Sequence, residues 1–503
     1  MATAVLLPTQ TPADYHRIIS PTLEVPNDPE ISVPVGLLAC QRDPLRKSIE
    51  TTVVSVSVYQ PPAAPAGKKT KKSVIAPDIP NETLLHVLLH DTVIFPEGGG
   101  QPTDTGVITT KDNANWDVVQ CKRHGGHAVH YVKIPSGVEV DAALVAFTPG
   151  AKVTAALGEE GYSRRYDHMS MHTSQHLLSA LLETRLDLPT LSWSLTSYPS
   201  PCYVEIPRGM TQEEVMAIQT EANNLVFEGR RVHVEVEELN EKPAEVPKLE
   251  SGRSVGKALP EDYTGGVKRV VVIDGVDRNP CCGTHLPSIH NLQLFLLPHT
   301  EALSRSSATS ARLYFLAGPR LIAHLTQTHN LLTSTSAILS CGAPLVPERV
   351  NQVVEERKKA EKRVNDTETE LAGHIASGLV DSIKIHSGGL FKKHVHRTDD
   401  TGNALGFLTS IAFAVGAALS DAEGNNDHVL VLSSSPSSQN SSSISTVLIL
   451  GSDDAKVKAA GEGLKAKLGV KGGGKGPRWS GKFTGVWKEN RENVVIDEIL
   501  VSL

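Results

Sequence analysis

The sequence lacks a long apolar run, a dense set of cysteines and an excess of positive charge. Its most apolar stretch, Phe407–Leu419, is shorter than the ~20 residues that a membrane-spanning helix needs, and its first residues lack the basic segment of a signal peptide. Six cysteines in 503 residues are too few for a disulfide framework, which favours a reducing compartment. We therefore expect a cytoplasmic protein that does not enter a membrane. The net charge of −7 gives no sign of a strongly basic nucleic-acid-binding surface.

What the chain has is enough hydrophobic content, 40% of 503 residues, to bury more than one core, and its length favours about three domains. Residues 1–37 are proline-rich, and we expect them to be irregular. The alternation and turn signals that follow predict a small β-barrel-like domain to about residue 153. Its expected strands are Ile49–Tyr59, Thr83–Ile94, Gly106–Val107, Trp116–Cys121, Ala128–Ile134 and Glu139–Phe147.

Residues 154–300 mix helical and strand patterns, which is typical of an α+β domain. Met171–Leu182 has helical spacing, and its four leucines are placed to form one buried stripe. The other expected elements are strands at Cys202–Ile206, Arg231–Glu237 and Val267–Ile273, and a helix at Glu213–Phe227.

The last third of the chain begins with a long charged helix at Pro347–Ala372. Its heptad pattern is broken, so a spacer or weak coiled coil is as well supported as a dimer seam. Strands are expected at Val429–Ser433 and Ser445–Leu450, separated by a serine-rich loop. The helix Ala455–Leu468 precedes the glycine run 471–476, whose composition favours a solvated loop over a phosphate-binding segment.

Two short clusters carry potential metal ligands. The first is His172-Thr173-Ser174-Gln175-His176, in which the two imidazoles lie on one face of a helix. The second is Cys281-Cys282-Gly283-Thr284-His285, which follows an expected turn at Asp277–Pro280. Imidazole and thiolate donors together suit zinc better than calcium or magnesium. Spacing alone leaves open a His168–His172 pair, and Cys282 in place of Cys281.

The spacing excludes two kinds of zinc enzyme. A metalloprotease needs Glu directly after the first His, where this chain has Thr173. A nucleobase deaminase needs Cys three residues after Cys281, where Thr284 stands, and a preceding His-x-Glu. A structural zinc site with four protein ligands stays open.

Together these motifs resemble the alanyl-tRNA editing domain, which occurs in alanyl-tRNA synthetase and in free-standing AlaX-type proteins. The glycine-rich segment Asp91–Gly106 matches as well, and the resemblance extends from about Leu38 to Gly318. The Asp167-His168-Met169 start of the His segment is similar to the long AlaX form. By this resemblance, one zinc ion per chain is bound by His172, His176, Cys281 and His285.

The activity that the resemblance implies is hydrolysis of the ester that joins a wrong amino acid to tRNA(Ala), chiefly serine, with glycine as a second candidate. A site that hydrogen-bonds the serine hydroxyl selects the error over alanine, and Thr173 and Gln101 are the candidates near that hydroxyl. His168 is a candidate for proton transfer, although a solvated histidine is the favoured interpretation. The remaining expected substrate-binding residues are Gly98, Gly99, Gly100, Arg164 and Arg165.

The expected fold class is thus α+β multidomain, with the barrel-like domain at 38–153 and a zinc-binding editing domain at 154–318. A helical spacer at 319–377 precedes an α/β C-terminal domain at 378–503, which the resemblance links to tRNA binding or to self-association as a homodimer. Because no aminoacylation domain precedes the match, we expect editing in trans. The alternatives are a non-catalytic zinc-stabilised module that binds tRNA or protein and, less favoured, threonyl-tRNA-type editing.

Overall fold

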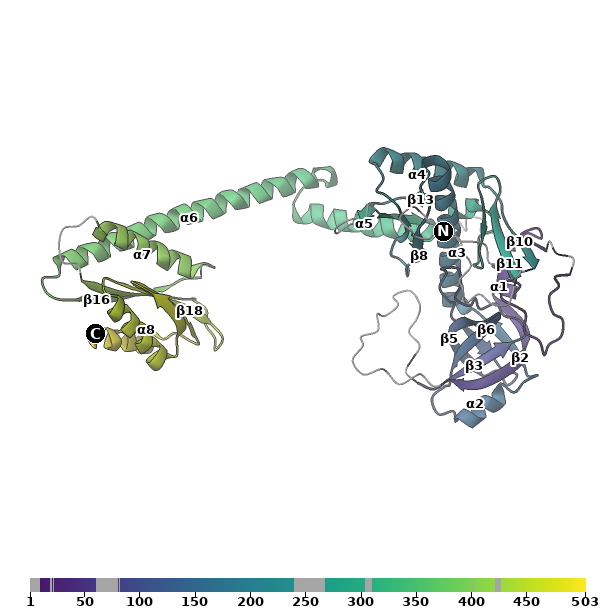
Figure 1. The fold of residues 1–503 in the computed structure, drawn as a ribbon, viewed down its shortest axis with the longest axis horizontal. Coiled ribbons are helices and arrows are strands. Elements are labelled where there is room, and N and C mark those ends of the chain that lie inside the picture. The colour runs from purple at the N-terminus through teal and green to yellow at the C-terminus, as the bar shows by residue number, and fades with distance from the viewer. Residues whose placement is uncertain are drawn as a thin grey trace. The chain divides into compact units, whose positions relative to one another are not determined.

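The chain forms two compact units, residues 1–332 and 333–503, in a computed structural model (Figure 1). The structure describes residues 10–18, 20, 22–59, 80, 82–238, 267–303, 310–400, 402–420 and 427–503. The fold is a mixed α+β multidomain fold, as predicted, and includes a barrel. The finer domain boundaries stay predictions. None of the helices in the described part of the chain combines the length and apolar character that a bilayer crossing needs.

The predicted barrel is confirmed as a closed, six-stranded one in the order β2-β3-β6-β5-β4-β7. The expected strand at Glu139–Phe147 is wrong, because this segment forms the helix α2 (Val140–Ala146), with Ala143 fully buried. A later strand closes the barrel instead. Its strands are β2 (Ser48–Tyr59), β3 (Leu84–Leu89), β4 (Gly106–Thr109), β5 (Asn115–His124), β6 (His127–Lys133) and β7 (Lys152–Ala156).

The helix α3 (Gly158–Leu186) is the central element of the first unit (Figure 1). It packs against β4 of the barrel and against α4 (Gln212–Glu228). The predicted leucine stripe is confirmed, since Leu177, Leu178, Leu181 and Leu182 are all buried. Burial of four such side chains anchors the helix, at about 1.5–3 kcal/mol for each.

Two sheets complete the first unit. One has the order β1-β10-β11-β12 and the other β13-β15-β9-β8, with β14 paired to β15. The segment predicted as a turn, Asp277–Pro280, is instead β12, which pairs antiparallel with β11. The strands are β1 (His16–Ile18), β8 (Ser192–Ser194), β9 (Cys202–Ile206), β10 (Val232–Glu238), β11 (Val267–Ile273), β13 (Phe295–Leu296), β14 (Thr300–Ala302) and β15 (Ala311–Ala317), and α1 is Ala39–Arg42.

The second unit is built on a sheet in the order β16-β17-β18-β20-β19, with hydrophobic clusters on both faces. The solvated loop expected at the glycine run is wrong: Lys471–Lys475 forms β19, an exposed edge strand paired with β20. The strands are β16 (Phe391–Thr398), β17 (His428–Ser435), β18 (Ile444–Gly451) and β20 (Arg478–Thr484). The helices are α6 (Val346–Ile385), α7 (Ala404–Ser420), α8 (Asp454–Leu468) and α9 (Val494–Val501), while α5 (Gly318–Ile338) includes the boundary between the units.

Candidate metal centre

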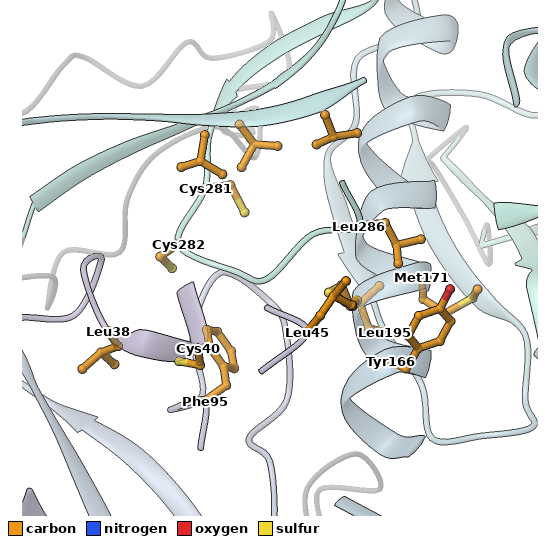
Figure 2. Close-up of a cluster of buried hydrophobic side chains, with 14 of the residues drawn as sticks. Leu38, Cys40, Leu45, Phe95, Tyr166, Met171, Leu195, Cys281, Cys282 and Leu286 are labelled. Carbon is orange, nitrogen blue, oxygen red and sulfur yellow. The ribbon is translucent and has the colours of Figure 1, made fainter. Parts of the chain in front are cut away.

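The two sequence clusters meet in the interior of the first unit. His172 and His176 lie one turn apart on α3, and Cys281 and His285 lie on the loop that follows β12. Their four potential ligand atoms lie within 4.8 Å of one another, and all four residues are buried. Figure 2 shows Cys281 and Cys282 at the start of this loop, with Leu286 further along it near α3. The spacing of these atoms fits a single small ion.

Each imidazole in this cluster has a partner for its outer nitrogen. Nδ1 of His172 lies 3.0 Å from Oε1 of Gln101, and Nδ1 of His176 lies 2.8 Å from Oδ2 of Asp277. Because amide and carboxylate oxygens only accept, these two Nδ1 atoms carry protons, and in the neutral imidazole Nε2 is then the nitrogen that can bind a metal. In the third histidine, Nε2 faces the Cys281 sulfur at 3.4 Å, while Nδ1 lies 3.3 Å from the Thr173 hydroxyl.

The charges in the cluster favour a thiolate at Cys281. Burial alone raises the pKa of the Cys281 thiol, but His172 and His285 hold that pKa well below its ordinary range. Burial lowers the pKa of His176, but Asp277 and Cys281, through hydrogen bonds and negative charge, together outweigh burial and raise this pKa to about 10. Burial lowers the pKa of His285 to about 3. A thiolate surrounded by imidazoles is the donor set that zinc prefers.

The structure also bears on the alternatives that spacing left open. Cys282 lies outside the four-residue group, and burial raises the pKa of its thiol to about 12. His168 also lies outside the group. The interpretation of His168 as a solvated histidine is wrong: its side chain is 1% exposed, and burial, with Arg164 and Arg320 nearby, lowers its pKa to about 2. His172 therefore meets His176 rather than His168.

The glycine-rich segment forms a tight turn against the cysteine loop. Gly98 and Gln101 exchange two backbone hydrogen bonds of 3.1 Å, and φ is positive at Gly99 (+61°) and Gly100 (+75°). A Cβ added at Gly99 would lie 3.1 Å from the Cys282 sulfur, and one at Gly100 would lie 2.3 Å from Nε1 of Trp193. Glycine is therefore required at this turn by backbone conformation and by close packing.

Gln101 and Thr173 are fully buried, and their polar atoms hold the metal loop. Gln101 accepts a hydrogen bond from the Thr284 amide (2.9 Å) and donates one to the Thr284 hydroxyl (2.8 Å). The Thr173 hydroxyl donates to the Met169 carbonyl (2.9 Å) and accepts from the Leu286 amide (3.0 Å). Gln101 and Thr173 thus support the loop that carries the metal ligands. Their predicted role near a serine hydroxyl stays a prediction.

The two arginines predicted to bind substrate differ in their surroundings. The Arg165 guanidinium is fully buried, pairs with Asp104, and donates to the Val93 carbonyl at 2.6 Å. This places Arg165 in a structural role between α3 and the glycine-rich segment. Arg164 is partly buried and donates to the Thr103 carbonyl at 3.2 Å.

Asp277 is a residue of this site that sequence reasoning missed. It was assigned to a turn, but it belongs to β12, where its carboxylate reaches His176 across the site. An acidic residue four positions before a candidate cysteine ligand is a weak signal, because acidic residues are also common in turns. Only the pairing of β12 with β11 directs this carboxylate at α3.

Comparison with known proteins identifies relatives over most of the chain, although no protein-family model matches it. The chain is 33% identical over 343 residues to the mouse alanyl-tRNA editing protein Aarsd1, covering 68% of this chain and 74% of that protein. The rat Aarsd1 is 30% identical over 446 residues, which cover 88% of this chain and 93% of the relative. This chain belongs to the alanyl-tRNA editing protein family.

Two further relatives show how much of an editing protein and of a ligase the chain matches. The putative alanyl-tRNA editing protein alaX of Saccharomyces cerevisiae is 29% identical over 496 residues, covering 94% of this chain and 98% of that protein. The alanine–tRNA ligase of Thermococcus kodakarensis is 28% identical over 305 residues, covering 59% of this chain but only 30% of the ligase. The chain therefore matches the editing proteins over most of their length and the ligase over a limited part.

Proposed function

We propose that this protein is a zinc-dependent aminoacyl-tRNA hydrolase that removes serine, with glycine as a second substrate, from mischarged tRNA(Ala). The observation that carries the proposal is the cluster of His172, His176, Cys281 and His285, buried and within 4.8 Å. Family membership supports it, because the named relatives are editing proteins. The near full-length match to such a protein also supports action in trans, on tRNA charged by a separate enzyme.

One zinc ion per chain would be bound by the Nε2 atoms of the three histidines and by the Cys281 thiolate. The chemistry that a bound zinc ion would supply with four protein ligands is anchoring of the terminal adenosine and orientation of the scissile ester. The chain's own residues hold the protons at Nδ1 of His172 and His176, through Gln101 and Asp277. Burial of the ligands limits access of bulk water, which strengthens electrostatic interactions in the site.

Selection against alanine would come from groups that pair with the serine hydroxyl. A pocket that hydrogen-bonds a hydroxyl rejects the analogue that lacks it, since its polar groups would stay unpaired. Gln101 and Thr173 line the metal loop and are the proposed source of this selectivity, with His168 one turn away on α3 for proton transfer. The backbone of Gly98, Gly99 and Gly100 and the side chain of Arg164 are the proposed contacts to the tRNA 3′ end.

The proposed activity also bears on the location of the protein and on the roles of its domains. A protein that edits tRNA(Ala) for translation would act in the cytoplasm. The second unit, which contains α6 and the sheet β16–β20, would bind tRNA or join two copies of the chain. Within the first unit, the zinc-binding editing domain would comprise residues 154–318, beside the barrel at 38–153.

A second candidate function is a zinc-stabilised module that binds tRNA or protein without catalysis. The observation that favours it is the closed set of four protein ligands, because catalytic zinc sites usually keep one open position. The hydrogen-bonded outer shell of the cluster suits a structural site equally well.

Deacylation of tRNA(Ala) charged with serine, glycine or alanine separates these functions. We expect the wild type to release serine fastest and to spare alanine. Cys281→Ala should lose both zinc and activity, since the thiolate is one of four ligands. Cys282→Ala is the matched control, because its thiol lies outside the cluster, and it should keep its zinc. Stoichiometric zinc without hydrolysis of any of the three esters would overturn the editing proposal and leave the binding module.

A further inference from the structure

The loop that carries Cys281 and His285 has little regular secondary structure to hold it. It leaves β12 at Pro280, and the next element, a short 3-10 helix, begins only at Ile289. A zinc site tolerates deviations of only a few tenths of an ångström in ligand distances. The position of this loop must therefore be fixed by contacts other than a helix or a sheet.

Three buried side chains supply such contacts from distant parts of the sequence. Tyr15, Gln41 and Arg269 donate hydrogen bonds to carbonyl groups of the loop, and we call these three residues the carbonyl clamp. Their exposed fractions are 1%, 0% and 1%, so water does not compete for their donors. The carbonyls that they hold belong to Cys281, Cys282, Gly283 and His285.

Arg269 on β11 makes the largest contribution to the clamp. One guanidinium nitrogen, Nη1, donates to the carbonyls of Cys281 (3.2 Å) and Gly283 (2.7 Å). Nη2 donates to the Gln41 carbonyl at 3.3 Å, and the Arg269 carbonyl accepts from the Cys281 amide at 3.1 Å. Arg269 thus holds the ligand residue Cys281 from both its backbone and its side chain.

Gln41 and Tyr15 hold the two remaining carbonyls. Nε2 of Gln41, on α1, donates to the Cys282 carbonyl at 2.6 Å, while its Oε1 accepts from the Gly36 amide at 2.6 Å. The Tyr15 hydroxyl donates to the carbonyl of the ligand residue His285 at 3.0 Å. Tyr15 comes from the proline-rich segment that was expected to be irregular, directly before β1.

The burial of Arg269 indicates that its hydrogen bonds to the loop are the reason for a charged residue at this position. Within the described part of the chain Arg269 forms no ion pair with a carboxylate, and its guanidinium donates its hydrogen bonds to backbone carbonyls. A buried cation without a carboxylate costs several kcal/mol unless its surroundings compensate. A residue that only filled space would be apolar, which would avoid this cost.

We propose that Tyr15, Gln41 and Arg269 are positioning residues that fix Cys281 and His285 for metal binding. This inference rests on the proposed zinc centre, and it assigns the precision of that centre to residues that do not touch the ion. The clamp also makes the N-terminal segment and α1 part of the site, although their residues lie more than 200 positions before the loop in the sequence.

The test measures zinc affinity of the full-length chain by competition with a chelator, and the absorption of the cobalt-substituted protein, which reports thiolate coordination. We expect Arg269→Met to weaken zinc binding by about 10–100-fold, as for other residues that support ligands. Arg269→Lys keeps the positive charge but lacks the forked donors of the guanidinium. Its zinc affinity should therefore lie between those of the wild type and Arg269→Met. Tyr15→Phe removes one hydroxyl and should cost about fivefold. Tyr166→Phe is the matched control, since the buried Tyr166 hydroxyl has no hydrogen-bond partner in the described structure.

The outcomes separate the clamp from the proposed function. Weaker zinc binding and altered cobalt absorption in Tyr15→Phe and Arg269→Met, with Tyr166→Phe unchanged, would support the clamp. If Tyr15→Phe and Arg269→Met keep wild-type affinity and absorption while Cys281→Ala loses its zinc, the clamp is overturned and the metal centre stands. A wild type that binds no zinc would overturn both. If Arg269→Met does not fold, Tyr15→Phe alone decides between these results.

Discussion

The two units each contain a cluster of neighbouring histidines, fully buried in the first unit and partly buried in the second, and of these two clusters only the first is arranged for a metal. In the first unit, each histidine has one nitrogen toward a common centre and the other held by an outer partner. In the second unit, both nitrogens of His396 contact serine hydroxyls, Ser433 at 2.8 Å and Ser435 at 3.1 Å, and His394 contacts the same Ser433 at 2.8 Å. Proximity of imidazoles is therefore not sufficient; the free lone pairs must converge.

The groups that contact the histidines also shift their pKa values in opposite directions in the two clusters. The carboxylate of Asp277 contacts His176 and, together with Cys281, raises the pKa of His176 to about 10. The neutral hydroxyl of Ser433 gives His394 no such compensation, and burial lowers the pKa of His394 to about 4. The difference lies in the charge of the groups that contact each histidine. An anionic partner makes a histidine a strong ligand or a cation, whereas hydroxyl partners keep it neutral.

The largest difference between the clusters should appear in metal affinity when an outer partner is removed. We expect Asp277→Asn to weaken zinc binding by about 10–100-fold, because the carboxylate orients His176 and makes it more basic. The matched change in the other cluster, Ser433→Ala, should leave zinc affinity at the wild-type value. Chelator competition on both variants measures this. Equal zinc affinity in the two variants would contradict the role given to Asp277.

Acid should affect the second cluster through His394. Its folded pKa, about 4, lies below the ordinary value of 6.5, so the unfolded chain binds more protons between these pH values and stability falls as the pH is lowered through that window. The size of this loss is on the order of 3 kcal/mol. Hydrogen exchange of the β17 amides at pH 6.5 and pH 4.5 measures it. His394→Gln should reduce the loss, and an unchanged loss in that variant would assign it to other groups.

The smallest expected difference concerns one glycine from each glycine run, Gly100 and Gly473. Gly100→Ala forces a positive φ on alanine and places Cβ 2.3 Å from Trp193, so we expect a loss of about 1–3 kcal/mol in unfolding free energy. At Gly473, an added Cβ meets nothing within 4 Å, and Gly473→Ala should change stability by less than about 0.5 kcal/mol. Urea unfolding measures both. A similar cost at the two positions would refute the view that Gly100 is closely packed and Gly473 is not.

Much of the fold could be predicted because its patterns are local. The alternation of apolar residues located β9 and β11 with correct bounds, and helical spacing located the buried leucines of α3. The errors occurred where local patterns are ambiguous. Glu139–Phe147 has apolar residues that suit a strand or a short helix, and the run 471–476 has a composition that suits a loop until a neighbouring strand supplies hydrogen bonds.

The sequence by itself determined the chemistry of the candidate site: three imidazoles and a thiolate at spacings that suit a helix and a loop, in a chain whose motifs resemble an editing domain. The resemblance also named His172, His176, Cys281 and His285, which spacing alone did not single out. Only the tertiary structure shows these four side chains meeting without His168 and Cys282, and only it brings Asp277, Tyr15, Gln41 and Arg269 to the same place. The physical reason is that side-chain type and helical spacing are local properties, whereas hydrogen bonds between residues of different elements depend on how the sheets and helices pack.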